Sequence, residues 1–200
     1  MSEDCSYQAE CYACQTPLDI LFICDKCDEV QPPQECDAFT LFGWKADLPV
    51  APQEVQKRYM TLQKRIHPDA MLGMSAQSQL YAPTWSASLN QAYAVLKSPL
   101  HSLRLALEIA GQKMDTIHTD TVILEEGMAI QEKIARMEDQ PENEIEDDLK
   151  NLRQAEERYI QEGIKTLQSN ELSQATRAYL RANQIHKSLS RFLSRLRAHT

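Results

Sequence analysis

Glycine and aromatic residues are scarce in this 200-residue chain, which holds 5 glycines and in which 6% of the residues are aromatic. Scarce glycine beside abundant Leu, Ala, Gln, Glu and Lys favours helices over a β-sheet. No run approaches the ~18 apolar residues that a membrane-spanning helix needs. A basic excess is also missing. The net charge of −8 argues against broad affinity for nucleic acids, whose phosphates need a basic surface.

Cysteine does not occur after residue 36, and all six cysteines lie before residue 37. This uneven distribution predicts a small N-terminal module with its own chemistry. A disulfide framework is typical of secreted proteins. The acidic start, MSEDCSYQAE, has the features neither of a secretory signal peptide nor of an Arg-rich organelle import leader. We therefore expect either a cytosolic chain or one from which a leader is missing.

Four of the cysteines form two C-x-x-C pairs, Cys11 with Cys14 and Cys24 with Cys27, separated by nine residues. Each pair directs two sulfurs toward one point, and two pairs complete a tetrahedral thiolate site of the structural zinc type. Four thiolates leave no open coordination position. We therefore expect one structural zinc ion that holds together a segment too small to fold alone.

The spacer between the pairs is long enough for two short strands and a turn, and the sequence ILFI at residues 20–23 predicts one of these strands. Redox-active pairs and disulfides are the alternatives to a metal site. A redox C-x-x-C usually occurs singly near a βαβ pattern, which this sequence lacks. Cys5 and Cys36 lie outside the spacing and are interpreted as spare thiols.

Helical periodicity dominates the chain after residue 36. A short helix is predicted at 37–44, with Asp37 as its N-cap. Pro52 suits the first turn of the next helix, on which the apolar residues of one face are Val55, Tyr59, Leu62 and Ile66. Further helices are predicted at about 76–97, with Pro83 near its start or kinking it, at 100–110, closed by Gly111, and at 120–138, 143–168 and 171–197. The last three have short links and predict a bundle.

The sequence QKRIHPDAML interrupts this helical pattern at residues 63–72. Pro68 lacks an N–H and disfavours helical geometry at the preceding residue, so a loop begins at His67. The helix before the loop has a basic polar face on which Glu54 is the only acid, and the basic residues are Lys57, Arg58, Lys64 and Arg65. His-Pro-Asp alone is a weak signal, and an ordinary turn between two helices is the alternative.

The tripeptide in this context resembles the J-domain, the part of co-chaperones that stimulates ATP hydrolysis by DnaK-class chaperones. The matching region runs from about Asp37 to Leu107. A tetracysteine module before it and a helical bundle after it look like the HscB family, and more specifically like its eukaryotic form, which serves iron–sulfur cluster assembly. The segments that resemble this family in order and spacing are FTLFGW, LQKRIHPD, LNQAYAVLKSPLHSLRLAL and ILEEGMAIQEKIARME.

The resemblance implies that the chaperone is bound by the loop residues His67, Pro68 and Asp69, with Asp69 paired to an arginine of the chaperone. Pro68 limits the freedom of the loop, so that less ordering entropy is lost on docking. The basic helix face would steer the approach to an acidic surface of the ATPase domain, and its residues are Lys57, Arg58, Lys64 and Arg65. A merely solvated helix face is the alternative.

The resemblance also implies that the C-terminal bundle binds the IscU-type scaffold protein. The expected contacts on its first helix, Leu124, Met128 and Glu132, are spaced by four and share one face. Packing of Leu124 and Met128 inside the bundle is the alternative.

On the last helix, the family's aromatic contact position falls near Arg181, beside Tyr179 and Leu180. This departure leaves the scaffold contacts on that helix open. Gly127 and Ala129 also depart from the family, which often has acidic and apolar residues at these positions.

The predicted fold is mainly α, with three parts: a small zinc-bound β-hairpin module (1–36), a J-domain helical hairpin (37–111) and a C-terminal three-helix scaffold-binding bundle (112–200). The predicted function is a non-enzymatic co-chaperone that stimulates a DnaK-class chaperone and delivers the IscU-type scaffold. The resemblance points to the mitochondrial matrix, with the cytoplasm as alternative, and a homodimer stays open. The rival functions are a general J-domain co-chaperone for unfolded clients, a zinc-ribbon nucleic-acid binder and a thiol oxidoreductase.

Overall fold

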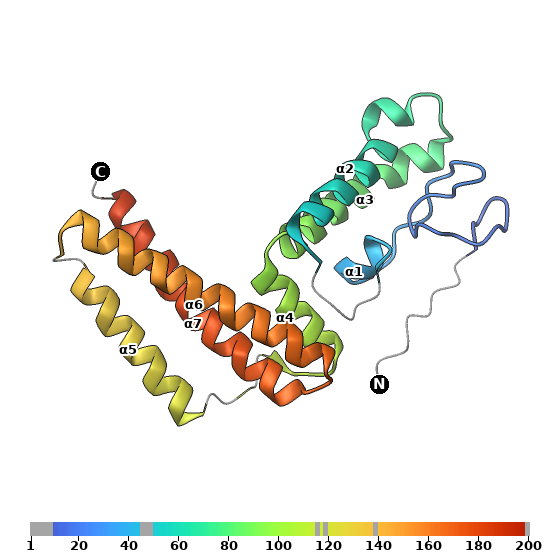
Figure 1. Ribbon diagram of the computed structural model, residues 1–200. Helices are drawn as coiled ribbons and strands as arrows, with labels where there is room; N and C mark the ends of the chain where they lie inside the picture. The colour runs from blue at the N-terminus through green and yellow to red at the C-terminus, as the bar shows by residue number, and fades with distance from the viewer. Residues whose placement is uncertain (1–9, 45–49, 115–116, 118–119, 138–139, 199–200) are drawn as a thin grey trace. The chain divides into compact units, whose positions relative to one another are not determined.

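The chain forms two compact units of mostly helical structure in the computed structural model, which describes residues 10–44, 50–114, 117, 120–137 and 140–198 (Figure 1). Within these residues, the first unit extends to Ser98 and the second begins at Pro99. The helices confirm the predicted mainly α fold. None of the described helices is long and apolar enough to cross a membrane.

The first unit contains the short helix α1 (Ala38–Leu41), α2 (Pro52–Arg65), the 3-10 helix η1 (Pro68–Met71) and α3 (Ala76–Leu96). Asp37 caps α1 as predicted, because its Oδ1 accepts hydrogen bonds from the N–H groups of Phe39 at 2.8 Å and Thr40 at 3.1 Å. α3 continues through Pro83.

α2 and α3 lie side by side as an antiparallel pair (Figure 1). Tyr59 stacks on Tyr93 with ring centroids 4.3 Å apart and donates to Asn90 at 2.7 Å. One turn later on α2, Gln63 donates to Ser86, earlier on α3, at 3.1 Å. Residues later on α2 therefore contact residues earlier on α3. This antiparallel order is the geometry of the predicted helical hairpin. Its enclosed apolar residues include Val55, Leu62, Ile66, Leu89 and Leu96.

The N-terminal cysteine segment forms no β-ladder in its described part, residues 10–36, so the predicted β-hairpin with residues 20–23 as a strand is wrong there. Three isolated antiparallel bridges occur instead, Glu10 with Pro17, Ile20 with Ile23 and Ile23 with Val30. Tight turns account for the difference. Each C-x-x-C pair is followed by a residue with a left-handed backbone, Gln15 at φ 59° and Asp28 at φ 57°, which leaves too little extended chain for a ladder.

The cysteine segment packs on α3 and shares its core. Phe22 is fully buried against Trp85, with ring centroids 5.9 Å apart. Trp85 Nε1 donates to the carbonyl oxygen of Gln31 at 2.8 Å. The N–H of Val30 donates to Ser78 Oγ at 2.8 Å. These contacts fix the segment to one side of α3 although it has no sheet of its own.

The second unit is a bundle of α4 (Pro99–Ile109), α5 (Thr121–Met137), α6 (Glu142–Gln168) and α7 (Leu172–Ala198). The bounds of α5, α6 and α7 agree with those of the predicted three-helix bundle to within one residue at every end. Gly111 closes α4 at φ +90°, while the N–H of Gln112 donates to the carbonyl oxygen of Leu107 at 2.9 Å. α4 packs against α6 and α7. The predicted three-domain division stays a prediction.

Two apolar clusters support this bundle. One joins α4 to α6 and α7 and consists of Leu100, Leu103, Leu107, Ile160, Ala175, Tyr179 and Ala182. The other joins α5 to α6 and α7 and consists of Ile134, Met137, Leu152, Ile185, Leu189 and Phe192. α6 and α7 contribute to both clusters, so they form the common wall on which α4 and α5 pack.

Gly163 of α6 lies where α4 packs tightly on α6, because a Cβ there would lie 2.7 Å from Cδ2 of the fully buried Leu103. We expect Gly163→Ala to lower the free energy of unfolding by about 1 kcal/mol. Overpacking costs roughly 1–3 kcal/mol, and the helix propensity of alanine offsets about 1 kcal/mol of it. Urea unfolding followed by circular dichroism measures the change.

Gly127→Ala on α5 is the matched control. A Cβ at Gly127 meets only the flexible side chain of Gln184, 2.6 Å away at Oε1, which can move aside. We expect this variant to be as stable as the parent or more so. A Gly163→Ala protein that equals the control would show that the contact between α4 and α6 is not tight.

Candidate metal centre and partner-binding surfaces

The four cysteines of the two C-x-x-C pairs converge on one point, as their spacing predicts. Their sulfurs all lie within 4.8 Å of one another. The Sγ atoms of Cys11 and Cys27 are 3.6 Å apart, as are those of Cys14 and Cys24. Metal–sulfur bonds of about 2.3 Å in a tetrahedron place sulfurs roughly 3.8 Å apart. The cluster can therefore hold a metal ion with its four thiolates. Cys36 lies outside it, and Cys5 lies outside the described residues.

The sulfurs of this cluster ionise unequally. Hydrogen bonds from the side chain and backbone of Thr16 lower the pKa of Cys14 to about 6. The backbone N–H of Glu29 lowers the pKa of Cys27, but burial and the neighbouring sulfurs raise it to about 12. Like charges this close cannot all form without a counter-charge. A bound cation supplies that charge, so the arrangement suits a metal better than four free thiols.

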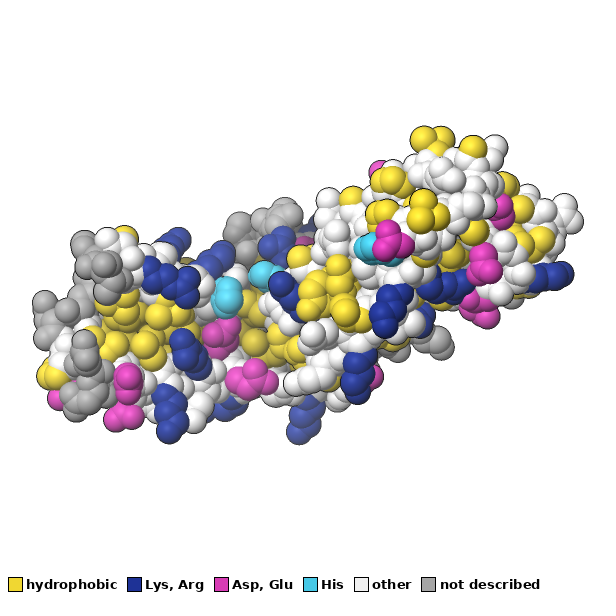
Figure 2. Space-filling model, turned by 90° about the horizontal axis from the view of Figure 1, so that it is seen from above, with side chains coloured by type: hydrophobic (Ala, Val, Ile, Leu, Met, Phe, Trp, Pro, Cys, Tyr) yellow, Lys and Arg dark blue, Asp and Glu magenta, His cyan; other side chains and the backbone are white. Residues whose placement is uncertain are grey.

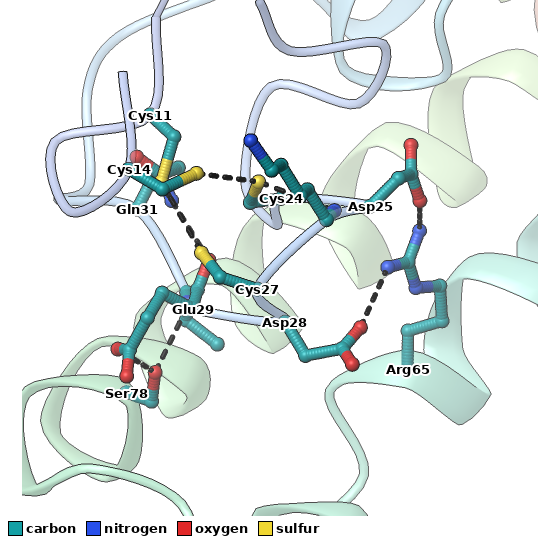
Figure 3. Close-up of polar contacts among 12 residues, drawn as sticks. Cys11, Cys14, Cys24, Asp25, Cys27, Asp28, Glu29, Gln31, Arg65 and Ser78 are labelled. Carbon is teal, nitrogen blue, oxygen red and sulfur yellow. Dashed lines mark hydrogen bonds and ion pairs between the residues drawn. The ribbon is translucent and has the colours of Figure 1, made fainter. Parts of the chain in front are cut away.

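Glu29, two residues after Cys27, connects the cysteine segment to the start of α3 (Figure 3). Its Oε2 accepts hydrogen bonds from Ser75 at 2.6 Å, from Ser78 at 2.8 Å and from Tyr12 at 3.0 Å. The hydrogen bond from Ser75, followed by those from Ser78 and Tyr12, lowers the pKa of the Glu29 carboxyl despite its partial burial. Ser75 is also the N-cap of α3, where a negative charge is favourable.

The His-Pro-Asp loop lies at the tip of the helical hairpin, where η1 begins directly after His67. His67 Nδ1 accepts a hydrogen bond from the N–H of Asp69 at 3.3 Å and lies 3.5 Å from Asp69 Oδ2. The side chains of His67, Pro68 and Asp69 are all exposed. Figure 2 shows a histidine beside an acidic side chain at the surface, bordered by hydrophobic side chains. The loop therefore presents an imidazole and a carboxylate outward together.

The four basic residues of α2 differ in exposure and in contacts. Lys57 and Lys64 are exposed, and Lys57 forms a surface ion pair with Glu54 at 3.2 Å. Arg58 is half-buried and donates from Nε to the carbonyl oxygen of Phe42 at 3.0 Å. Arg65 forms ion pairs with the carboxylates of two residues in the cysteine segment, Asp25 and Asp28.

The predicted scaffold-binding residues of α5 are at the surface of the bundle. The side chain of Leu124 is 50% exposed and that of Met128 is 63% exposed. Glu132, one turn further on, is exposed as well. The alternative that Leu124 and Met128 are core residues is therefore wrong. Gly127, between them, allows the close approach of Gln184 from α7.

The three residues named on α7 have different surroundings. Tyr179 is 4% exposed and belongs to the apolar cluster on α4, so the structure does not support direct contact between its side chain and a partner. Leu180 is half-buried against the same cluster. Arg181 donates twice to Glu126 of α5, at 2.6 and 3.2 Å. These hydrogen bonds raise the pKa of Arg181 and join α7 to α5.

The chain is similar in sequence to known co-chaperones. The chain is 32% identical over 106 residues to the co-chaperone protein HscB of Proteus mirabilis, a match that covers 51% of this chain and 61% of that protein. It is 29% identical over 135 residues to the iron–sulfur cluster co-chaperone protein HscB homolog of Arabidopsis thaliana, covering 66% of this chain and 53% of that protein. The matches thus span less than two thirds of either relative. No protein-family model matches the chain.

Two solved structures share its fold. The crystal structure of human co-chaperone protein HscB has a TM-score of 0.75 and 21% identity, over 94% of this chain and 98% of the human one. HscB from Vibrio cholerae has a TM-score of 0.67 and 23% identity, over 82% of this chain and 99% of the other. At these identities the structural likeness shows the fold alone. The sequence relatives and the cysteine cluster are further points of likeness. The chain therefore resembles HscB co-chaperones both in sequence and in fold. The HscB co-chaperone family is non-enzymatic.

Sequence reasoning missed several residues that support the site of this chain. Asp25, Asp28 and Glu29 of the cysteine segment contact α2 and the start of α3 from about 40 to 50 positions away. Ser75, before a predicted helix, carries the usual N-cap signal, but nothing in the sequence pairs it with Glu29. The exposed α5 face, by contrast, was expected from the spacing by four of Leu124, Met128 and Glu132.

Glu29→Gln removes the charged acceptor and keeps its shape. We expect a loss of about 1 kcal/mol in unfolding free energy at pH 7, the low end for charge-assisted hydrogen bonds because the carboxylate is partly exposed. The folded pKa lies below the ordinary 4.5. The stabilisation is therefore complete above pH 4.5 and is lost as the pH falls through the lower, folded value. The difference between parent and variant should narrow on acidification, as read by urea unfolding.

Glu35→Gln, at an exposed glutamate of the same segment, is the control and should behave as the parent at every pH. Thiolates of the cluster also become protonated in acid, but they do so in parent and variant alike. The difference between the two curves is therefore the quantity to follow. A difference that stays constant from pH 7 to about pH 3 would contradict the assigned role of the Glu29 carboxylate.

Proposed function

We propose that this chain is a co-chaperone of iron–sulfur cluster biogenesis that stimulates ATP hydrolysis by a DnaK-class chaperone. The observation that carries the proposal is the exposed His67-Pro68-Asp69 loop at the tip of an antiparallel helical hairpin, in a chain that resembles HscB co-chaperones. The hairpin supplies rigidity through its buried core, and the loop supplies the polar groups that a partner can bind.

The geometry suits docking with little loss of entropy. Pro68 restricts the backbone, and the hydrogen bond from Asp69 N–H to His67 Nδ1 keeps the two side chains together before binding. The exposed carboxylate of Asp69 can pair with a cation of the chaperone. Lys57 and Lys64, exposed on α2, supply the steering charge. Arg58 and Arg65 contribute to the same basic face from contacts within the unit.

The same proposal assigns delivery of an IscU-type scaffold protein to α5 and α7. Leu124 and Met128 expose apolar side chains one helical turn apart, and Glu132 continues the face. Adjacent exposed apolar residues mark a protein-binding site better than single ones do, and a flexible methionine adapts to a partner surface. Arg181 and Leu180 would border this face on α7, with Tyr179 supporting them from the core.

We assign the metal of the cysteine cluster as one structural zinc ion. Four thiolates at tetrahedral spacing favour this ion, and they leave no position for a substrate. The compartment that the family resemblance favours is the mitochondrial matrix, with the cytoplasm as the alternative. A general J-domain co-chaperone for unfolded clients remains the rival function.

His67→Gln should abolish stimulation of the chaperone's ATPase while scaffold binding stays at the parental level. Loss of the proposed contact of His67 with the chaperone lowers stimulation by about tenfold or more. The exposed position of His67 predicts no change in helical content or melting temperature. Single-turnover ATP hydrolysis with purified DnaK-class chaperone, with and without scaffold protein, measures the effect.

His101→Gln is the matched control, since it makes the same change at an exposed histidine of the other unit. It should stimulate as the parent does. Parental stimulation by His67→Gln would contradict the role of the loop.

The double variant Leu124→Ala with Met128→Ala should bind the scaffold at least roughly tenfold more weakly, because exposed apolar contact residues contribute about 1–2 kcal/mol each when buried by a partner. Its helical content and melting temperature should stay at the parental values, since both side chains lie outside the core. Titration calorimetry with folded scaffold protein measures the affinity.

Leu80→Ala, at an exposed leucine of the first unit, is the control and should bind the scaffold normally. Unchanged affinity of the double variant would contradict the assigned surface. Binding of denatured model substrates in place of folded scaffold would favour the general co-chaperone.

A further inference from the structure

Arg65, the last residue of α2, reaches into the turn between Cys24 and Cys27 (Figure 3). Its guanidinium forms an ion pair with Asp25, and its Nη2 lies 3.4 Å from Asp28 Oδ1. The arginine side chain is only 23% exposed. The two carboxylates directly follow the two metal-ligating positions of the second C-x-x-C pair. One cation thus links the cysteine cluster to the end of the helix.

The positions of both carboxylates depend on that turn. The N–H of Asp28 donates to the carbonyl oxygen of Cys24 at 3.0 Å, and the N–H of Lys26 donates to Cys24 Sγ at 3.4 Å. No β-ladder holds the described part of the segment together. A turn of this kind keeps its shape when its two sulfurs are tied to one ion. Metal in the cluster would therefore fix the carboxylates that Arg65 contacts.

Arg65 also stands next to the proposed chaperone loop. Ile66 follows it and is fully buried, and His67 begins the loop. The loop is closed by the N–H groups of Ala70 and Met71, which donate to the carbonyl oxygen of His67 at 2.8 and 3.2 Å. A contact that fixes the last turn of α2 therefore fixes the point from which the loop leaves the helix.

We propose that Arg65 is a positioning residue through which metal in the cysteine cluster orders the His67–Asp69 loop. The inference rests on the proposed function only in taking this loop as the chaperone contact. The metal holds the Cys24–Cys27 turn, the turn holds Asp25 and Asp28, and their ion pairs hold Arg65. Because such coupling is reciprocal, metal loss weakens the Arg65 ion pairs by the factor by which loss of these ion pairs weakens metal binding, and the order of the loop falls with them.

The first experiment measures metal affinity on the full-length chain by competition between zinc and a chromogenic chelator. Arg65→Gln should bind zinc about two- to tenfold more weakly, the range for two partly exposed ion pairs. The double variant Asp25→Asn with Asp28→Asn, which removes the contact from the other side, should show the same loss. Adding Arg65→Gln to that double variant should cause no further loss.

Lys64→Gln is the matched control, because Lys64 is exposed and its replacement removes the same charge one residue earlier. It should bind zinc as the parent does. Equal affinity of the parent and Arg65→Gln, or an equal loss in Lys64→Gln, would overturn the proposal.

The second experiment follows amide hydrogen exchange of Ala70 and Met71. In the parent, removing zinc should speed their exchange by about the same two- to tenfold factor as the affinity loss. In Arg65→Gln, their exchange should be fast already with zinc bound. Chelation could melt the hairpin of the parent. In that case the exchange of Ala70 and Met71 is measured in the zinc-loaded Asp25→Asn, Asp28→Asn protein, whose cluster is filled but whose contact with Arg65 is lost. Parental exchange in that protein would overturn the proposal.

Both measurements use the chain alone, without chaperone. A negative result would therefore leave ATPase stimulation by the loop untouched. Conversely, a chain that stimulates no chaperone could still show the coupling, so failure of this inference and failure of the proposed function are distinguishable.

Discussion

The convergence of four sulfurs on one point is the constraint on which the first unit depends. The cysteine segment has no β-ladder among its described residues, and its backbone bends through two left-handed positions, Gln15 and Asp28. Conformational entropy opposes such a fold, and a segment of this size cannot offset it with its own core. The cluster closes the segment, from which Phe22 and Gln31 contact Trp85 of α3. The hairpin that carries the loop thus shares part of its core with the metal module.

A division of labour between arginine and lysine follows from this packing. Arg58, Arg65 and Arg181 each hold fixed partners within the protein, because a planar guanidinium forms several directed hydrogen bonds at once. Lys57 and Lys64 stay exposed on α2, where Lys57 forms only a surface ion pair with Glu54. The basic residues of one helix face therefore have different surroundings, although the sequence shows them alike.

Periodicity and spacing predicted most of the architecture, because both are local signals. The helices at 52–65, 121–137 and 142–168 and the convergence of Cys11, Cys14, Cys24 and Cys27 follow from residues close together in the chain. What could not be predicted depends on contacts across long separations. Arg65 meets Asp25 from 40 positions away, and Glu29 meets Ser75 from 46. The predicted strand at 20–23 failed for a local reason, because tight turns at Gln15 and Asp28 leave too little extended chain for a ladder.

The two units are stabilised in different ways, so the two proposed binding surfaces should respond differently to loss of metal. The two apolar clusters of the second unit consist only of helical residues, one from α4, α6 and α7 and the other from α5, α6 and α7. The α5 face with Leu124 and Met128 therefore stands on an ordinary helical core. The proposed chaperone loop at His67 stands on a hairpin beside the cysteine segment, whose four thiolates could hold a metal. Loss of a bound metal should therefore act on the first unit before the second, while the surface assigned to the scaffold keeps its support. Metal availability would then change the proposed stimulation of the chaperone without changing the proposed binding of the scaffold.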